Sequence, residues 1–236
     1  MSKEEGVVLM SFEWHKESHL QWNSMSDRWQ QNSEEMWERG SRKTILPLFT
    51  KHVDATGGAI LDAGCGDGYG TWKLALLGFK VTGVDLSDEM IKKASSRTKE
   101  GLALQFMQAD VIQLPFEDEK FAGILTINCL EWIEDPLQGL LELKRVLIPG
   151  GVACIGILGP TAAPRQHSFQ RLYGKNVICN GMMPWEFARL AEENGFQIID
   201  QEGVFKRGVS DRTVGALSLE LRQALSFMWL FVLRKD

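Results

Sequence analysis

The chain has 236 residues, a formal net charge of -5, and 24% charged residues. This length suits one α/β domain with additions, and it allows a sizeable core without disulfide bridges. The 26 Lys and Arg residues form no block, which argues against a nucleic-acid partner.

The cysteines and the apolar runs indicate the compartment and the kinds of partner to expect. The four cysteines lie far apart and form no CxxC pair, so we expect no disulfide framework, no metal site and a reduced, cytoplasmic setting. Residues 1–6 are charged and no apolar core follows them, so no secretory signal is expected. The apolar run 227–233 is too short to span a bilayer, so we expect no membrane partner.

Residues 1–56 precede the first predicted strand and contain four tryptophans within the first 37 positions. Residues 11–32 are polar between these rings, and residues 34–53 have helical periodicity that Gly40 and Pro47 interrupt. So many tryptophans are unusual for an exposed tail. We interpret residues 1–56 as a helical cap over a ligand site, with Trp29 and Arg42 as candidate ligand contacts.

A glycine turn follows the first strand. The apolar run that ends at Asp62 predicts a buried strand, and residues 71–77 predict a helix that stops at Gly78. Between them stand Gly64, Gly66 and Gly68, which permit positive φ angles and close approach of a ligand. A strand, a glycine turn and a helix form half of a βαβ unit, and this is where open α/β sheets bind nucleotides.

The residues of this turn argue against a dinucleotide. A carboxylate at Asp62, at the mouth of the site, would repel a pyrophosphate, and the third glycine of a dinucleotide motif would fall on Tyr69. The pattern fits a cationic ligand without phosphate, such as S-adenosylmethionine. The run Asp62-Ala63-Gly64-Cys65-Gly66-Asp67-Gly68 resembles the glycine motif of class I S-adenosylmethionine-dependent methyltransferases.

The second predicted strand, residues 79–85, ends on Asp85. A carboxylate at this point can accept hydrogen bonds from both ribose hydroxyls, and the resemblance implies this role. Leu86 follows, Ser87 is a plausible N-cap, and Met90 is placed near the adenine. A helix through residue 99 completes this unit.

The third and fourth strands supply the next candidates. Residues 102–107 predict a strand, and after it the resemblance implies contacts to the adenine from Ala109, Asp110 and Val111. An Asx turn at Asp110 is the structural alternative. The apolar run 121–128 predicts the central strand, and its end should lie beside the sulfonium, with the three contacts Asn128, Cys129 and Leu130.

The following segment departs from the resembled family. Many small-molecule methyltransferases have a histidine where Trp132 stands, so a histidine-assisted mechanism at this position is in doubt. We expect a helix to start at 131–136 and to continue over 136–147. Residues 145–151 resemble the family's structural helix exit and lead into a strand over 152–158.

After residue 158 the resemblance becomes generic. Residues 159–181 read as an irregular insertion that shapes the substrate pocket, with His167 and Tyr173 as weak candidates for a catalytic or orienting role. A helix over 183–194 and a strand over 196–203 follow. Residues 204–222 remain ambiguous, and residues 225–234 close the sheet.

The resemblance, nearest to the ubiquinone and menaquinone biosynthesis methyltransferases, implies a Rossmann-like α/β fold. The expected sheet is doubly wound and seven-stranded, mostly parallel with its last strand antiparallel, in a domain over residues 57–236. S-adenosylmethionine is the implied cofactor, and Arg42 could pair with its carboxylate. The expected substrate is a small molecule, without a metal, and the expected state is a monomer or homodimer.

Three alternatives stay open: a protein that binds the cofactor without transferring a methyl group, a methyltransferase acting on a macromolecule, and a nicotinamide oxidoreductase. Asp62 and Tyr69 disfavour the oxidoreductase.

Overall fold

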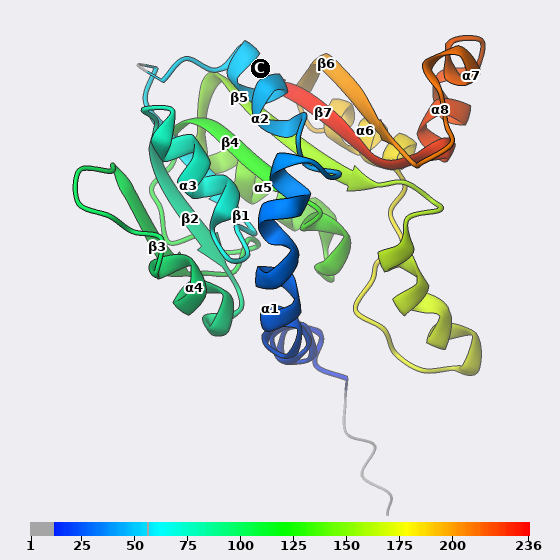
Figure 1. Ribbon diagram of the computed structural model, residues 1–236, viewed down its shortest axis with the longest axis horizontal. Helices are drawn as coiled ribbons and strands as arrows, with labels where there is room; N and C mark the ends of the chain where they lie inside the picture. The colour runs from blue at the N-terminus through cyan, green and yellow to red at the C-terminus, as the bar shows by residue number, and fades with distance from the viewer. Residues whose placement is uncertain (1–11, 56) are drawn as a thin grey trace, which may run out of the picture.

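The computed structural model describes residues 12–55 and 57–236; the expectations for residues 1–11, including that of no secretory signal, lie outside it. One seven-stranded sheet forms its centre, in the order β3-β2-β1-β4-β5-β7-β6 (Figure 1). The strands are β1 (Ala59–Ala63), β2 (Lys80–Asp85), β3 (Leu104–Gln108), β4 (Phe121–Ile127), β5 (Leu147–Leu158), β6 (Phe196–Phe205) and β7 (Ser226–Lys235). β7 runs antiparallel to both β5 and β6, and the other pairs are parallel. The predicted sheet is therefore confirmed.

Helices cover both faces of the sheet. They are α1 (Trp14–Glu38), α2 (Ile45–His52), α3 (Tyr69–Leu76), α4 (Asp88–Ser95), α5 (Pro136–Val146), α6 (Pro184–Glu193), α7 (Asp211–Gly215) and α8 (Leu219–Leu225), with 3-10 helices η1 (Leu130–Trp132) and η2 (Ala163–Tyr173). No helix within the described residues is both long and apolar enough to cross a bilayer.

Successive side chains along each strand point to opposite faces of the sheet, so the hydrophobic core consists of two layers. In β7, Trp229, Phe231 and Leu233 pack into the layer beneath α5 and α6. The residues between them, such as Leu230 and Val232, pack into the layer beneath α2 and α3. Because both faces are covered, β7 is continuously apolar over residues 227–233 rather than alternating.

The N-terminal helices differ from the prediction in their boundaries. α1 is one long helix that ends at Glu38, and the chain turns before α2 starts at Ile45. Gly40 makes this turn possible, because a Cβ there would lie 2.8 Å from the Cα of Met36. Pro47 does not interrupt a helix: it lies in the first turn of α2, where no N–H donor is needed.

One other predicted boundary was wrong, and one segment left open by the sequence is now assigned. The helix expected from residue 131 is a short 3-10 turn, and α5 begins only at Pro136, where Asp135 accepts a hydrogen bond from the Gln138 amide at 3.0 Å. The ambiguous segment 204–222 ends β6 and then forms α7 and α8, with serine caps at Ser210 and Ser218.

Candidate functional site

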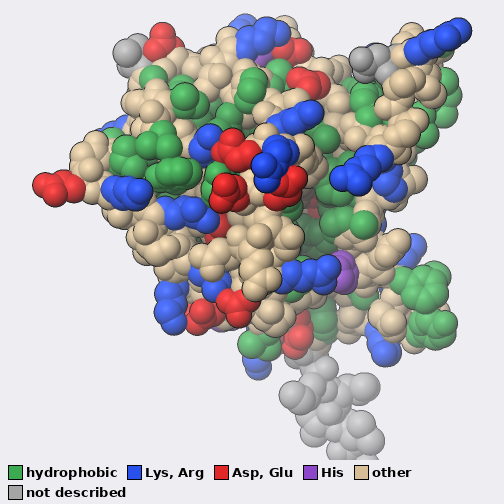
Figure 2. All heavy atoms as spheres, in the orientation of Figure 1, with side chains coloured by type: hydrophobic (Ala, Val, Ile, Leu, Met, Phe, Trp, Pro, Cys, Tyr) green, Lys and Arg blue, Asp and Glu red, His purple; other side chains and the backbone are tan. Residues whose placement is uncertain are grey.

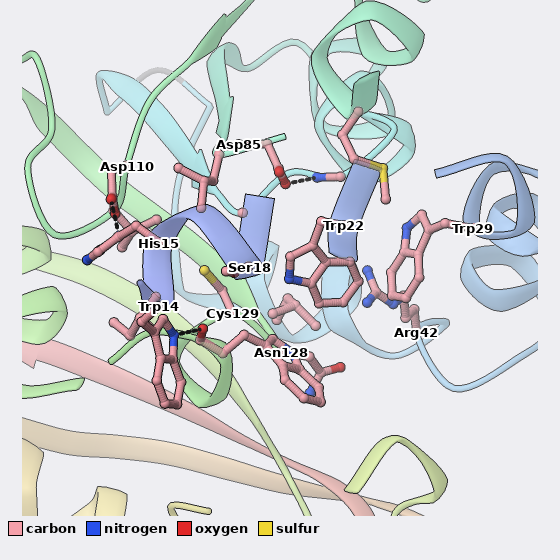
Figure 3. A pocket seen from close by; sticks show the side chains of 18 residues that line it. Trp14, His15, Ser18, Trp22, Trp29, Arg42, Asp85, Asp110, Asn128 and Cys129 are labelled. Carbon is pink, nitrogen blue, oxygen red and sulfur yellow. Dashed lines mark hydrogen bonds and ion pairs between the residues drawn. The ribbon is translucent and has the colours of Figure 1, made fainter. Parts of the chain in front are cut away.

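A cavity lies above the carboxyl ends of β1, β2 and β4, where the strand order reverses, and α1 crosses over it (Figure 3). Such a switch point is the usual ligand position of an open α/β sheet. We call it the first cavity. Its lining residues are Trp14, His15, Ser18, Trp22, Trp29, Arg42, Gly64, Gly66, Asp85, Leu86, Met90, Asp110, Val111, Ile127, Asn128, Cys129, Trp132 and Ile133.

The first cavity is narrow in this conformation. Its free volume is about 70 Å³, whereas sites for small organic ligands hold roughly 300–1,000 Å³. Tryptophan rings occupy much of the space: Trp22 packs edge-on against Trp29 at 5.8 Å and against Trp132 at 5.7 Å between ring centroids. Entry of a nucleoside-sized ligand therefore requires α1 or these rings to move.

The glycine turn forms the floor of the first cavity. Gly64, Gly66 and Gly68 have φ angles of 75°, 56° and 74°. Residues with a Cβ atom rarely adopt this left-handed region of backbone conformation. A Cβ on Gly66 would lie 3.1 Å from the Trp29 Nε1 atom, and one on Gly64 would lie 2.7 Å from the Cys129 Sγ atom. Glycines at these positions thus keep both the backbone conformation and the free space.

Asp85 ends β2 at one wall of the cavity. Its Oδ2 atom accepts a hydrogen bond from the Gly66 amide at 2.9 Å, and its Oδ1 atom accepts one from the Ser87 amide at 3.0 Å. Burial raises the pKa of this carboxyl, while the amides lower it. Ser87 caps α4 through a hydrogen bond from the Met90 amide, as predicted. The carboxylate is therefore fixed with lone pairs still available to a ligand.

Asp62 does not line the cavity; it lies beneath the turn with 4% exposure. Its Oδ2 atom accepts a hydrogen bond from the Thr71 hydroxyl at 2.6 Å. Burial raises the pKa of Asp62 to about 6, and the Arg42 charge opposes that shift. The expected position at the mouth of the site was wrong, because Thr71, in the first turns of α3, holds the carboxyl under the glycines.

Arg42 is a buried cation at the opposite wall. Its guanidinium lies 4.8 Å from the Trp29 ring centre and 5.4 Å from that of Trp37, in cation–π contacts. The guanidinium itself makes no hydrogen bond or ion pair with any residue that the structure describes. Burial lowers its pKa to about 10, so it stays charged at neutral pH. Figure 3 shows it beside Trp29.

Asp110 contacts a histidine from α1 that the sequence analysis did not predict. The His15 Nδ1 atom lies 2.8 Å from the Asp110 Oδ2 atom, while Asp110 Oδ1 accepts a hydrogen bond from the Ile112 amide at 3.1 Å. The Asx turn weighed as an alternative is thus present, and the carboxyl lines the cavity as well. Figure 3 shows His15 reaching it from α1.

The signal for this contact was a spacing of four along α1. The His19 Nε2 atom and the Asn23 Nδ2 atom each lie 2.7 Å from the Asp88 Oδ1 atom. Lys93 donates to Asp27 at 2.6 Å. One polar stripe on α1 therefore consists of His15, His19, Asn23 and Asp27. Its hydrogen bonds and ion pairs hold α1 against α4 and against the loop after β3.

At the end of β4, Asn128 has a φ angle of 53°, a region that asparagine tolerates better than most residues. It faces the cavity beside Cys129, whose thiol pKa is raised by burial. The Trp132 carbonyl accepts a hydrogen bond from the Trp14 Nε1 atom at 2.8 Å, so α1 is also fastened here.

The structure brings together most of the predicted cofactor contacts. Those lining the first cavity are Trp29, Arg42, Gly64, Gly66, Asp85, Leu86, Met90, Asp110, Val111, Asn128 and Cys129. Those outside its lining are Asp62, Ala63, Cys65, Gly68, Ala109 and Leu130. The lining residues not predicted are Trp14, His15, Ser18, Trp22, Ile127, Trp132 and Ile133. Four of these seven come from α1.

A second cavity, of about 480 Å³, lies between α1 and the segment 167–179. Trp132 lines both cavities. His167 lines the second cavity, and Tyr173 is 69% exposed and lines neither. Among the described residues, no group of three or more His, Cys, Asp or Glu side chains is placed to hold a metal ion.

Comparison with known proteins adds to this geometry. Residues 61–155 match the family described as "Methyltransferase domain". A demethylmenaquinone methyltransferase of Lactococcus lactis is 37% identical over 53% of this chain and 52% of its own length. The biotin biosynthesis bifunctional protein BioHC of Teredinibacter turnerae is 30% identical over 67% of this chain. The match spans only 30% of BioHC, and about half of the L. lactis relative.

Solved structures show the same fold. A methyltransferase in complex with the Trm112 activator of Haloferax volcanii superimposes with a TM-score of 0.68 at 19% identity, covering 91% of this chain and 97% of that one. The [4+2]-cyclase SpnF does so with a TM-score of 0.62 at 21% identity, covering 84% and 82%. The matching segment 61–155, the relatives and the shared fold support a class I S-adenosylmethionine-dependent methyltransferase.

Proposed function

We propose that this protein binds S-adenosylmethionine in the first cavity and transfers its methyl group to a small-molecule acceptor. One observation carries the proposal. A fixed carboxylate, a glycine floor and an unpaired buried guanidinium surround a single cavity at the switch point of the sheet. These groups match the ribose, the nucleoside body and the amino-acid carboxylate of that cofactor.

The chain offers a partner for each part of the cofactor. Asp85 would accept from the ribose hydroxyls, and Arg42 would pair with the carboxylate through its forked donors. Asp110 and Val111 would hold the adenine, with Met90 against it. His15 now occupies one oxygen of Asp110, so adenine binding would share or displace that contact. When bound, the cofactor supplies a methyl group on a sulfonium, a reactive carbon with a neutral leaving group.

The protein's own contribution is alignment and exclusion of water. The rings of Trp22, Trp29 and Trp132 make the cavity apolar, and α1 closes it from above. We propose residues 1–56 as the cap of a domain over 57–236. A base is needed only for a weakly acidic oxygen or a protonated nitrogen in the acceptor, and we assign none.

We place the acceptor at the second cavity, which shares Trp132 with the first cavity. Transfer would require the Trp132 ring to turn aside, so that the acceptor atom reaches the methyl carbon. The walls of the second cavity come from α1 and from residues 159–181, which we call the insertion. Apolar side chains such as Leu20, Val177 and Ile178 line it with polar Gln21 and Asn176. This lining supports an acceptor with apolar or aromatic surface. The relatives named demethylmenaquinone methyltransferases support the same class.

Calorimetry with S-adenosylhomocysteine tests the cofactor site. Gly66→Val should lower the affinity at least about 100-fold, because the side chain would enter the space between the turn and Trp29. Gly78→Val is the matched control: Gly78 also has a positive φ, of 92°, yet a Cβ there meets nothing within 4 Å. Unchanged affinity in Gly66→Val and in Asp85→Asn would refute the site.

Transfer itself needs a separate measurement, because a cyclase shares the fold. Tritiated methyl incorporation from S-adenosylmethionine into a fractionated extract should label the small-molecule fraction. Label confined to protein or RNA would favour a macromolecular acceptor. Tight cofactor binding without any label would favour a protein that binds the cofactor but transfers nothing.

A further inference from the structure

The insertion presents a group of exposed apolar side chains at the rim of the second cavity. Phe169, Leu172 and Tyr173 are 51%, 66% and 69% exposed, and the Phe169 and Tyr173 rings pack edge-on at 5.6 Å. They lie on η2, which extends from the end of the sheet at the lower right of Figure 1. Figure 2 shows a hydrophobic group there, standing out from the body. We call these three residues the apolar patch.

The base of the insertion is firmly held. Arg165, which is 8% exposed, donates hydrogen bonds to the carbonyls of Leu158, Gly159 and Met182 at 2.6–2.9 Å. Asn180 donates to the Leu130 carbonyl at 2.7 Å. Residues 169–176, by contrast, are all exposed. The apolar patch therefore projects from a base that hydrogen bonds hold in place. Its side chains stay exposed to solvent and do not pack onto the core.

The charge within the insertion has one sign. No Asp or Glu occurs between Glu142 and Glu186, although the chain as a whole has a formal charge of -5. Within the insertion the exposed charges are Arg171 and Lys175, and His167 is exposed beside them. Glu17 faces the second cavity from the α1 side. Cations next to exposed aromatic and aliphatic side chains are the composition that binds an anionic lipid surface.

We propose that the insertion is a membrane-surface contact, in which the apolar patch enters the headgroup region of an anionic bilayer while Arg171 and Lys175 bind lipid phosphates. The helices need not cross the bilayer for such a contact, so the earlier expectation of no membrane partner is revised only for the surface. On the proposed function, an acceptor dissolved in lipid would reach the second cavity directly. The contact itself does not depend on methyl transfer.

Other occupants fit the patch less well. A stable protein interface buries about 800 Å² on each partner, and three side chains on one short helix provide much less. In a two-fold contact between copies of this chain, Arg171 and Lys175 would also meet their own like charges. A convex, basic, apolar tip suits a soft anionic surface better than either.

Co-sedimentation of the full chain with vesicles tests the proposal. The wild type should bind vesicles of equal parts phosphatidylcholine and phosphatidylglycerol at low salt, and bind phosphatidylcholine alone weakly. Phe169→Ser/Leu172→Ser/Tyr173→Ser should lower the partition coefficient about tenfold or more. Arg171→Gln/Lys175→Gln should lower it about 25-fold, about fivefold for each charge.

Leu76→Ser/Leu77→Ser is the matched control, since these leucines are 53% and 54% exposed at the end of α3; it should bind as the wild type does. Equal binding of wild type and patch variants would overturn the proposal. So would a patch-dependent dimer in sedimentation equilibrium without vesicle binding. S-adenosylhomocysteine affinity should stay unchanged in every variant, which separates this proposal from the cofactor assignment and shows that the variants are folded.

Discussion

At the scale of single residues, a buried acid beneath the glycine turn and a buried base in the wall of the first cavity have no direct hydrogen bond between them. Asp62 is held by Thr71, and the Arg42 guanidinium lies over the rings of Trp29 and Trp37. Burial shifts both pKa values: it raises the pKa of Asp62 to about 6 and lowers the pKa of Arg42 to about 10. Both shifts disfavour the charged form, so a ligand carboxylate near Arg42 would relieve part of that penalty.

The shifted pKa of Asp62 predicts a pH-dependent stability. Because the folded-state pKa lies above the unfolded value of about 3.8, the folded state binds the extra proton between about pH 4 and pH 6. The stability that protonated Asp62 provides is therefore lost as the pH rises through this window. Asp62→Asn lacks this titrating group. Between pH 4 and pH 7 the free energy of unfolding of the wild type should therefore fall by about 2–3 kcal/mol relative to that of Asp62→Asn. Urea titrations at several pH values check this, and a pH-independent difference would contradict it.

The unpaired guanidinium of Arg42 predicts a ligand-dependent effect. Arg42→Gln should weaken binding of S-adenosylhomocysteine about 10- to 100-fold, because a charge-assisted hydrogen bond is worth about 1.5–3 kcal/mol. Methylthioadenosine lacks the amino-acid part and serves as the control ligand; its affinity should change by about twofold at most. Calorimetry with both ligands makes the comparison. Equal losses for the two would place Arg42 in a structural role.

At the scale of elements, α1 presents two functions on two faces. Its tryptophans Trp14, Trp22 and Trp29 enter the first cavity, while the polar stripe from His15 to Asp27 binds α4 and the loop after β3. Since the first cavity is narrow, the strength of the stripe sets how readily α1 lifts to admit a ligand. Asn23 is central, because it contacts both Ser87 and Asp88.

Removal of Asn23 should loosen this helix. Asn23→Ala eliminates two contacts to α4, and we expect amide hydrogens of α1 to exchange about 5- to 30-fold faster, corresponding to about 1–2 kcal/mol. Asn32→Ala is the control, because Asn32 donates only to the Arg28 carbonyl within the same helix. Hydrogen exchange with mass spectrometry of residues 14–38 measures the effect. Equal exchange in both variants would show that the stripe does not hold α1.

The strands and the glycine turn could be predicted from local patterns, because buried strands and glycine turns leave strong local signals. The seven-stranded sheet with its antiparallel last strand was predicted from the resemblance to a known family. The contacts from α1 were not predicted. The spacing of four from His15 to Asp27 marks a polar face of the helix. The partner of that face, such as Asp110 for His15, depends on a tertiary crossing that the spacing does not identify. Asp62 was misplaced for a similar reason, since only the packing of α3 brings Thr71 over it.

At the scale of the whole molecule, the first cavity joins segments from residue 14 to residue 133, including α1, the glycine turn and the ends of β2 and β4. The antiparallel pair β6 and β7 contributes no side chain to its lining. A ligand there would therefore tie the cap to the sheet, and its binding energy would add to the stability of the fold.

This coupling predicts a thermal shift. S-adenosylhomocysteine at a hundredfold excess over its Kd should stabilise the protein by about 2.7 kcal/mol. For a domain of this size, that corresponds to a rise in Tm of roughly 5–10 °C. Asp85→Asn should show little rise at the same concentration. Scanning calorimetry provides the measurement, and a larger shift with NADH than with S-adenosylhomocysteine would support an oxidoreductase instead.

The position of Trp132 in the lining of both cavities has a kinetic consequence if the proposed function holds. Each reactant would occupy a cavity of its own, so both would be bound before transfer and neither would have to leave first. Initial-velocity plots should therefore intersect, as in a sequential mechanism, and S-adenosylhomocysteine should compete with the cofactor. A smaller side chain at position 132 would merge the two compartments and allow solvent to reach the sulfonium, so that methyl groups would be lost to water.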